Sequence, residues 1–248
     1  MKPTALILNG DCGLHDTGWG HPEHQGRLPA IVNAIYRETP ALLDHVLQHE
    51  AQPAADTQLQ RVHTATHIDV IRAAVSHAGR TGEIVPIDAD TVVSGASWDA
   101  AVAAAGCAID AVDLVMSERS QTALALCRPP GHHATPERAM GFCLFNNVAV
   151  AARAAQAEHG VERVLIIDWD VHHGNGTQDA FYDDPHVFYL SLHIDGHYPG
   201  TGAASETGIG AGMGATLNVP LPAGTSAQEY RAAFRDALGL AFEAARPD

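Results

Sequence analysis

Short apolar runs alternate with longer Ala-rich stretches along this chain. Runs with the length and composition of buried strands occur at residues 4–8, 122–127, 164–167 and 187–192. Helical stretches occur at residues 96–116, 147–158 and 226–245; an Asn pair able to cap opens the second, and Ser226 is the expected cap of the third. The alternation predicts an α/β fold, with a mainly parallel central sheet covered by helices on both faces in three α/β/α layers.

The densest polar chemistry follows two of the predicted strands. RPPGHH (128–133) comes directly after the strand that ends at Cys127, and DWDVHHGNG (168–176) comes after the strand that ends at Ile167. In open parallel sheets the ligand site lies beyond the carboxyl ends of the strands, where the loops converge. If the two strands are near neighbours, we expect these loops to face each other across one crevice.

The DWDVHHGNG segment places two carboxylates and an imidazole at two-residue intervals. On an extended chain, Asp168, Asp170 and His172 point to one face, and Trp169 and Val171 point to the other. One carboxylate and one imidazole make a ligand pair suited to Zn²⁺, which we prefer, or to Fe²⁺. The competing interpretation is a turn in which an Asp accepts backbone amide bonds beside a helix-capping histidine. The full nine-residue string at a strand end favours the metal site.

Two adjacent histidines, His132 and His133, lie in the Pro-Gly loop that follows the other strand. Beside a metal-bound water, one imidazole could take the water's proton while the other donates to a leaving amine. Asp168 could hold one imidazole by a charged hydrogen bond, and neutral Asn175 could hold the other. A lone His-His pair is more often a chance pair exposed to solvent, so the acid–base interpretation depends on the metal site.

Other polar and aromatic positions near these loops are less specific. Phe142 and Tyr198 could wall a narrow slot for an aliphatic substrate stem, with core packing as an equal competitor for each. Residues 193–197 form a second His/Asp cluster, which we interpret as a pocket rim rather than as metal ligands. The glycine series from 202 to 214 predicts a tightly turning loop and no phosphate cradle. Ser191 lacks a GxSxG elbow, so a serine nucleophile finds no support.

Charge and cysteine content limit the partners of this chain. Fourteen basic against 29 acidic residues give a net charge of −15, which argues against nucleic acid as a partner. An acidic field favours cationic substrates such as polyamines or lysine-rich tails, although ordinary solubility is the simpler explanation. The four cysteines form no C-x-x-C pair, and no apolar run approaches the ~18 residues of a membrane span. We therefore expect a cytoplasmic protein with reduced thiols and no membrane partner.

These residues resemble the histone deacetylases and acetylpolyamine amidohydrolases, the metal-dependent deacetylases that share a fold with arginase. The resemblance runs nearly end to end, and RPPGHH together with DWDVHHGNG is its most specific part. The other matching stretches are HPE (21–23) through Arg27-Leu28, SWD (97–99), GFC (141–143) through Asn147, and YPGTG (198–202). Asn175, where some branches carry Asp, makes the chain look more like the class II and bacterial amidohydrolases.

The resemblance implies a zinc-dependent amidohydrolase that removes acetyl or other short acyl groups from lysine or polyamine amines. The implied partner is therefore an acylated amine, such as an acetyl-lysine peptide or an acetylpolyamine. The implied zinc ligands are Asp170 and His172, and the implied acid–base pair is His132 and His133, backed by Asp168 and Asn175. The implied substrate contacts are Phe142 and Tyr198 at the tunnel, the Gly141 carbonyl and, in an interior acetate pocket, Arg27. A structural K⁺ ion is implied near Asp168, Asp170, His172, Ser191 and Leu192.

The family pattern also contains an Asp in a Gly-Phe-Asp segment, as third zinc ligand, and an oxyanion-stabilising Tyr in a Gly-Gly-Tyr loop. The resemblance places both downstream of Asp248. We therefore expect one deacetylase-like domain over residues 1–248 that lacks its C-terminal part. Two ligands alone make a weaker zinc site, and losing the Tyr costs ~3 kcal/mol of oxyanion stabilisation.

Two other functions stay open from the sequence. The chain could be a catalytically silent or weakened acyl-ligand-binding fragment of such an enzyme. It could also be an arginase-like binuclear hydrolase, although we assign no second D-x-H or D-x-D strand end to a second metal. The same residues could cleave esters, and the sequence leaves an oligomer open.

Overall fold

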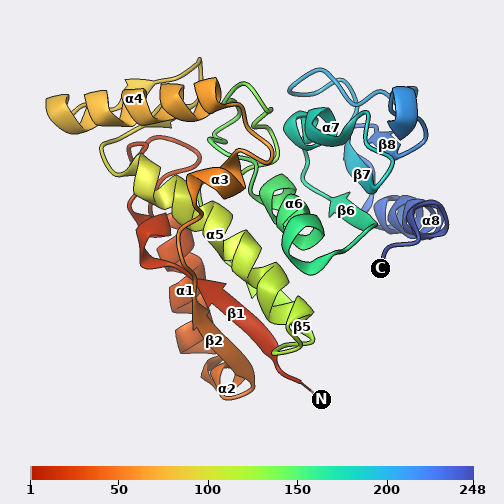
Figure 1. The fold of residues 1–248 in the computed structure, drawn as a ribbon, viewed down its shortest axis with the longest axis horizontal. Coiled ribbons are helices and arrows are strands. Elements are labelled where there is room, and N and C mark those ends of the chain that lie inside the picture. The colour runs from red at the N-terminus through yellow and green to blue at the C-terminus, as the bar shows by residue number, and fades with distance from the viewer. Residues whose placement is uncertain (1) are drawn as a thin grey trace. The chain divides into compact units, whose positions relative to one another are not determined.

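The computed structural model describes residues 2–248, which form two compact units. Unit 1 ends at His159, and unit 2 spans Gly160–Asp248. Figure 1 colours the chain from unit 1 in red to green through unit 2 in cyan to blue. Each unit contains a three-stranded, entirely parallel sheet. This confirms the predicted α/β class and the predicted parallel pairing.

Unit 1 is built on strands β1 (Thr4–Leu8), β2 (Val46–Glu50) and β5 (Thr122–Ala125), in the order β2-β1-β5. A short antiparallel hairpin joins β3 (Val85–Pro86) to β4 (Val92–Val93). The helices are α1 (Arg27–Glu38), α2 (Pro40–Leu43), α3 (Asp56–Leu59), α4 (Ala65–Thr81), α5 (Ser97–Met116) and α6 (Asn147–His159), with a 3₁₀ turn, η1, at Gly10–Gly13.

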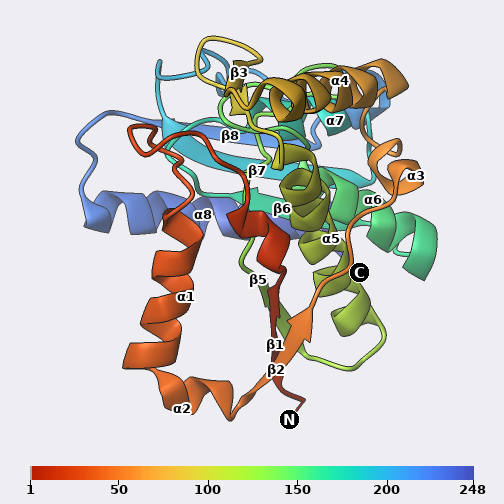
Figure 2. The same cartoon turned by 90° about the vertical axis from the view of Figure 1, so that its left-hand side faces the viewer.

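Helix α5 is the central helix of unit 1, and it lies beside β1 in both views (Figures 1 and 2). Five of its seven alanines are buried, because small side chains let β1, β5 and α6 approach the helix closely. Gly106 has no room for a side chain, since a Cβ there would overlap the backbone carbonyl of Gln52. Asn146 caps α6, since its Oδ1 accepts from the Ala149 amide at 3.1 Å.

Unit 2 contains β6 (Val164–Asp168), β7 (Val187–Ile194) and β8 (Thr216–Leu221), in that order. Its helices are α7 (Asn175–Phe181) and α8 (Ala227–Ala245), with a 3₁₀ turn, η2, at Gly210–Gly212. Helix α8 runs along this sheet (Figure 2) and packs its Ala237, Ala241 and Ala245 against apolar residues of β7. Ser226 and Glu229 form a capping box at its start, which confirms the predicted Ser cap.

The predicted strands and helices are present, with ends that differ by a few residues. β5 stops at Ala125, two residues short of its predicted end, and β7 runs two residues further, to Ile194. The glycine series predicted as a loop contains only the short η2 turn and is followed by β8. None of the helices within residues 2–248 is both long and apolar enough to cross a lipid bilayer.

Candidate functional site

The segment after β6 forms consecutive turns built by its own carboxylates. Asp168 Oδ1 accepts from the backbone amide of Asp170 at 3.1 Å, and Asp170 Oδ1 accepts from the amide of His172 at 2.8 Å. The prediction that the chain stays extended through His172 is therefore wrong, because β6 ends at Asp168 and the following residues bend. Each Asp side chain satisfies the amide two residues on, which is the local geometry that Asp favours over a strand.

The turn nevertheless brings Asp170 and His172 together. Asp170 Oδ1 lies 3.2 Å from His172 Nδ1, and both side chains are partly exposed. Two ligands of one tetrahedral zinc ion, each about 2.0–2.1 Å from the metal, lie about 3.3 Å apart. The carboxylate oxygen and the imidazole nitrogen therefore fit a common zinc ion. The edge of Tyr198 faces the same imidazole, with ring centroids 5.9 Å apart.

Asp168 and Ser191 are neighbours in the parallel register between β6 and β7. Asp168 Oδ2 accepts from the hydroxyl of Tyr189 at 3.0 Å, and burial together with this nearby carboxylate raises the pKa of that Tyr. Ser191 Oγ lies 2.9 Å from His193 Nδ1, and His193 Nε2 lies 3.0 Å from the Gly202 carbonyl. A carbonyl oxygen can only accept, so Nε2 of neutral His193 carries the ring proton and donates it to Gly202. Nδ1 is then unprotonated and accepts a hydrogen bond from the Ser191 hydroxyl. The lone pairs of Ser191 then stay available to a cation.

A buried polar network below this segment was not predicted from the sequence. His173 Nδ1 lies 2.8 Å from Thr201 Oγ1, and its Nε2 lies 3.1 Å from Gln178 Oε1. Gln178 in turn donates to Glu206, whose carboxylate also accepts from the amide of Gly202. Burial, followed by the nearby His193, lowers the pKa of His173 to about 4, so this imidazole is neutral near pH 7. The network ties the turns after β6 to the loop that carries Tyr198.

The twin histidines lie in unit 1, on the loop after β5. The ring centroids of His132 and His133 are 4.0 Å apart, and His133 is buried. Gly141 packs directly on His133, because a Cβ at position 141 would overlap the imidazole ring. Gly141 therefore has to be a glycine for steric reasons, and it also has a left-handed φ of +55°.

Two further buried histidines anchor this loop. His63 Nε2 accepts from the Asn146 amide at 2.9 Å, so its Nδ1 donates to the Thr135 carbonyl at 3.0 Å. His67 Nε2 donates to the Leu144 carbonyl at 2.8 Å. Burial, and next the neighbouring His67, lowers the pKa of His63 to about 3. These contacts were not predicted from the sequence; the two histidines are four residues apart, with His63 just before the Thr64 cap of α4 and His67 in its first turn.

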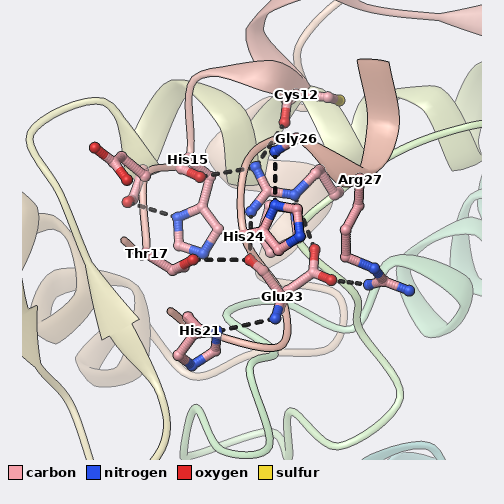
Figure 3. Close-up of polar contacts among 12 residues, drawn as sticks. Cys12, His15, Thr17, His21, Glu23, His24, Gly26 and Arg27 are labelled. Atoms are coloured by element: carbon pink, nitrogen blue, oxygen red, sulfur yellow. Dashed lines mark hydrogen bonds and ion pairs between the residues drawn. The ribbon is translucent and has the colours of Figure 1, made fainter. Parts of the chain in front are cut away.

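The start of the RPPGHH loop is fixed by a buried ion pair with Glu23, whose contacts to His21 and Arg27 are drawn in Figure 3. Arg128 Nε donates to Glu23 Oε1 at 2.8 Å, and its other nitrogens donate to the carbonyls of His15 and Glu23 at 2.7 and 2.9 Å. The side chains of Arg128 and Glu23 are almost fully buried, so removing either one would leave an unpaired buried charge. Arg27, the predicted acetate-pocket residue, forms an ion pair with Glu23 at the start of α1, and its side chain is 56% exposed.

The predicted site residues therefore fall into two groups. Unit 1 carries His132, His133, Gly141, Phe142 and Arg27, and unit 2 carries Asp168, Asp170, His172, Asn175, Ser191, Leu192 and Tyr198. Asn175 is the buried first residue of α7. Within residues 2–248, His, Cys, Asp and Glu side chains form no group of three that could hold a metal ion. The meeting of the two groups across one crevice stays a prediction.

Comparison with known proteins identifies the family. The histone deacetylase domain model matches residues 21–248. Histone deacetylase 10, chloroplastic, from rice is 42% identical over 92% of this chain and 54% of its own length. The histone deacetylase-like amidohydrolase of Pseudomonas aeruginosa is 40% identical over 91% of this chain and 57% of its own length.

A solved structure gives the same result. The crystal structure of the HDA15 HD domain superposes with a TM-score of 0.82 at 40% identity, covering 88% of this chain and 62% of that one. The match confirms the predicted three-layer deacetylase-like fold. The chain spans between about half and three-fifths of the length of the rice and Pseudomonas relatives that it matches. A domain match over nearly the whole chain, together with these identities, shows that the chain belongs to the histone deacetylase family.

Proposed function

We propose that this chain carries the catalytic residues of a metal-dependent deacetylase, which hydrolyses the amide of an acetylated or similarly short-acylated amine. The observation that carries the proposal is the 3.2 Å approach of Asp170 Oδ1 to His172 Nδ1, which suits two ligands of one zinc ion. Family membership supports the reaction class, and the net charge of −15 supports a cationic substrate such as a lysine-rich peptide or a polyamine.

Asp170 and His172 would hold the zinc ion, with Fe²⁺ as the alternative. When bound, this metal supplies a Lewis acid that polarises an amide carbonyl and lowers the pKa of a coordinated water. Asp168 orders the ligand turn through its bond to the Asp170 amide. Asp168, Ser191 and Leu192, with Asp170 and His172, would also hold a structural K⁺ ion, for which the accepting orientation of Ser191 Oγ is suited.

His132 and His133 would move the protons of the reaction. One imidazole takes a proton from the attacking water, and the pair then delivers a proton to the departing amine. Asp168 and Asn175 would orient the two rings, the charged partner favouring an imidazolium more than the neutral one. Phe142 and Tyr198 would line the acyl-lysine stem, the Gly141 carbonyl would accept from the substrate amide, and Arg27 would bind the acetate product.

The test is turnover of a fluorogenic acetyl-lysine peptide and of an acetylpolyamine by the chain supplied with Zn²⁺. We expect His132→Ala and His133→Ala each to lower kcat by about 10²–10⁴-fold, the usual contribution of one acid–base group. His77→Ala, which replaces an exposed histidine of α4, is the matched control and should leave turnover unchanged.

Two results would contradict the proposal. Equal turnover by the wild-type chain and a His132→Ala/His133→Ala double variant would remove the twin histidines from the mechanism. Binding of the acetyl-lysine peptide by fluorescence anisotropy, without turnover at any Zn²⁺ concentration, would instead identify a silent acyl-ligand-binding chain.

A further inference from the structure

A hairpin turn at the twin histidines has an unusual backbone. Met140 and Cys143 pair as an antiparallel bridge, each amide donating to the other's carbonyl at 3.2 and 3.0 Å. Gly141 and Phe142 occupy the two central positions, with φ values of +55° and +68°. A left-handed conformation is unfavourable for a bulky residue such as Phe. The surrounding structure must therefore hold Phe142 in this conformation.

One of the two central amides of the turn is satisfied by the loop between β3 and β4. The Phe142 amide donates to Thr91 Oγ1 at 3.0 Å. Thr91 Oγ1 donates its own proton to Asp90 Oδ1 at 3.2 Å. The Thr91 hydroxyl thus links the Phe142 amide to a carboxylate in one chain of hydrogen bonds, and Thr91 is only 1% exposed.

The Thr91 hydroxyl is itself held in place. Asp88 Oδ1 accepts from the backbone amides of Asp90 and Thr91 at 3.1 and 2.7 Å, which closes the loop between β3 and β4. His21 joins the same cluster, since its Nε2 lies 3.0 Å from the Asp90 carbonyl. The edge of the His21 ring also packs on Phe142, with ring centroids 4.7 Å apart. The segments that carry His21, Thr91 and Phe142 therefore meet at the Gly141–Phe142 turn.

We propose that Thr91 is a positioning residue whose hydroxyl fixes the Gly141–Phe142 turn, and through it the Phe142 wall and the His133 ring. The inference deepens the proposed function, on which its kinetic consequence rests. Without the hydroxyl, the Phe142 amide loses its acceptor and the left-handed Phe142 relaxes. Gly141, which packs on His133, moves with it.

The first test is hydrogen exchange of single backbone amides in the full chain. Thr91→Val keeps the shape of the side chain and removes the hydroxyl, whereas Thr91→Ser keeps the hydroxyl. We expect the Phe142 amide to exchange about tenfold faster or more in Thr91→Val, and at close to the wild-type rate in Thr91→Ser. The Asn146 amide, bound to His63, should keep its protection in both variants.

The second test is kinetic and uses an acetyl-lysine peptide. Thr91→Val should lower kcat/KM about tenfold, raising KM because the Phe142 wall moves and lowering kcat because the His133 ring moves with Gly141. Thr91→Ser should restore kcat/KM to within about threefold of wild type. In a double-mutant cycle with Phe142→Ala, the two effects should be strongly non-additive, which a merely stabilising role of Thr91 would not produce. Thr81→Val, at the exposed end of α4, is the control.

Any of three results would overturn the inference. The Phe142 amide of Thr91→Val would exchange at the wild-type rate, or the Asn146 amide would be accelerated as much as the Phe142 amide. The third is that the effects of Thr91→Val and Phe142→Ala on kcat/KM add in the double-mutant cycle. If the wild-type chain shows no turnover, the proposed function fails while the exchange rates still decide whether Thr91 holds the turn.

Discussion

Asp170 Oδ1 lies 3.2 Å from His172 Nδ1, and the same oxygen accepts the backbone amide of His172 at 2.8 Å. The carboxylate therefore holds both the backbone and the ring of the residue two positions on. For the zinc site that we propose, this arrangement would place the two ligand atoms near their final separation, so little ordering would be needed on binding.

The first prediction concerns metal binding by this pair. Asp170→Asn and His172→Ala should each weaken Zn²⁺ binding by about tenfold or more, because each removes one of two protein ligands. The measurement is competition for Zn²⁺ against a chromophoric chelator. His186→Ala replaces an exposed histidine of the same unit and should leave the affinity unchanged. Equal loss in all three variants would indicate nonspecific binding to surface side chains.

Much of the fold follows from local sequence signals. The apolar runs of β1 and β6 and the Ala-rich length of α5 identify these elements without tertiary information. Ser226 and Glu229 stand three residues apart before a helical pattern, and they form the capping box that this spacing indicates. These signals succeed because the interactions involved span only a few residues.

Some of the features that were not predicted depend on interactions between distant residues, and others on local signals with more than one interpretation. β2 contains the polar residues Gln48 and His49, and only its pairing with β1 makes it a strand. The turn after β6 was mistaken for an extended segment because period-two spacing suits both an alternating strand and two successive Asx turns. The contact between Thr91 and Phe142 joins residues 51 positions apart, which no local pattern reveals.

The second prediction concerns acid sensitivity through His63. Burial lowers the pKa of His63 to about 3, whereas an unfolded histidine titrates near 6.5. Between these values the unfolded chain binds a proton that the folded chain does not, so the free energy of unfolding falls as pH falls through this window. The loss from His63 approaches about 1.4 kcal/mol per pH unit.

Urea unfolding of His63→Gln between pH 4.5 and 7 tests this slope. We expect lower stability at pH 7, because the hydrogen bonds to Asn146 and Thr135 are perturbed. The free energy of unfolding should also depend less steeply on pH, because about one proton fewer is taken up on unfolding. Ile71→Val, a conservative change in the same unit's core, should lower stability by about 0.5–1.5 kcal/mol without altering the slope. A wild-type slope in His63→Gln would show that this histidine does not titrate as described.

The third prediction compares two glycines in the loop after β7. Gly202 and Gly200 have nearly equal φ values of +90° and +88°, so an alanine at either pays the same left-handed cost. At Gly202 the new Cβ would also lie 2.5 Å from His193 Nε2 and 2.6 Å from His173 Cγ, whereas at Gly200 it meets nothing within 4 Å. Gly202→Ala should therefore destabilise the protein by about 1–3 kcal/mol more than Gly200→Ala in urea unfolding. Similar losses would mean that the His173 network tolerates displacement.

The fourth prediction separates catalysis from folding at Gly141. A Cβ at Gly141 would overlap the ring of His133, whereas a Cβ at Gly82, which ends α4 with a φ of +73°, meets nothing within 4 Å. Gly141→Ala and Gly82→Ala both place an alanine in a left-handed conformation. The difference between the two variants in kcat/KM therefore reports the displacement of His133. We expect Gly141→Ala to lower kcat/KM for an acetyl-lysine peptide by about 10²-fold, as for a catalytic group misplaced by about 1 Å. Gly82→Ala should lose stability in urea unfolding and keep its turnover. If Gly141→Ala retained turnover within about twofold of Gly82→Ala, the position of His133 would not limit the reaction, and its assignment as an acid–base residue would have to be abandoned.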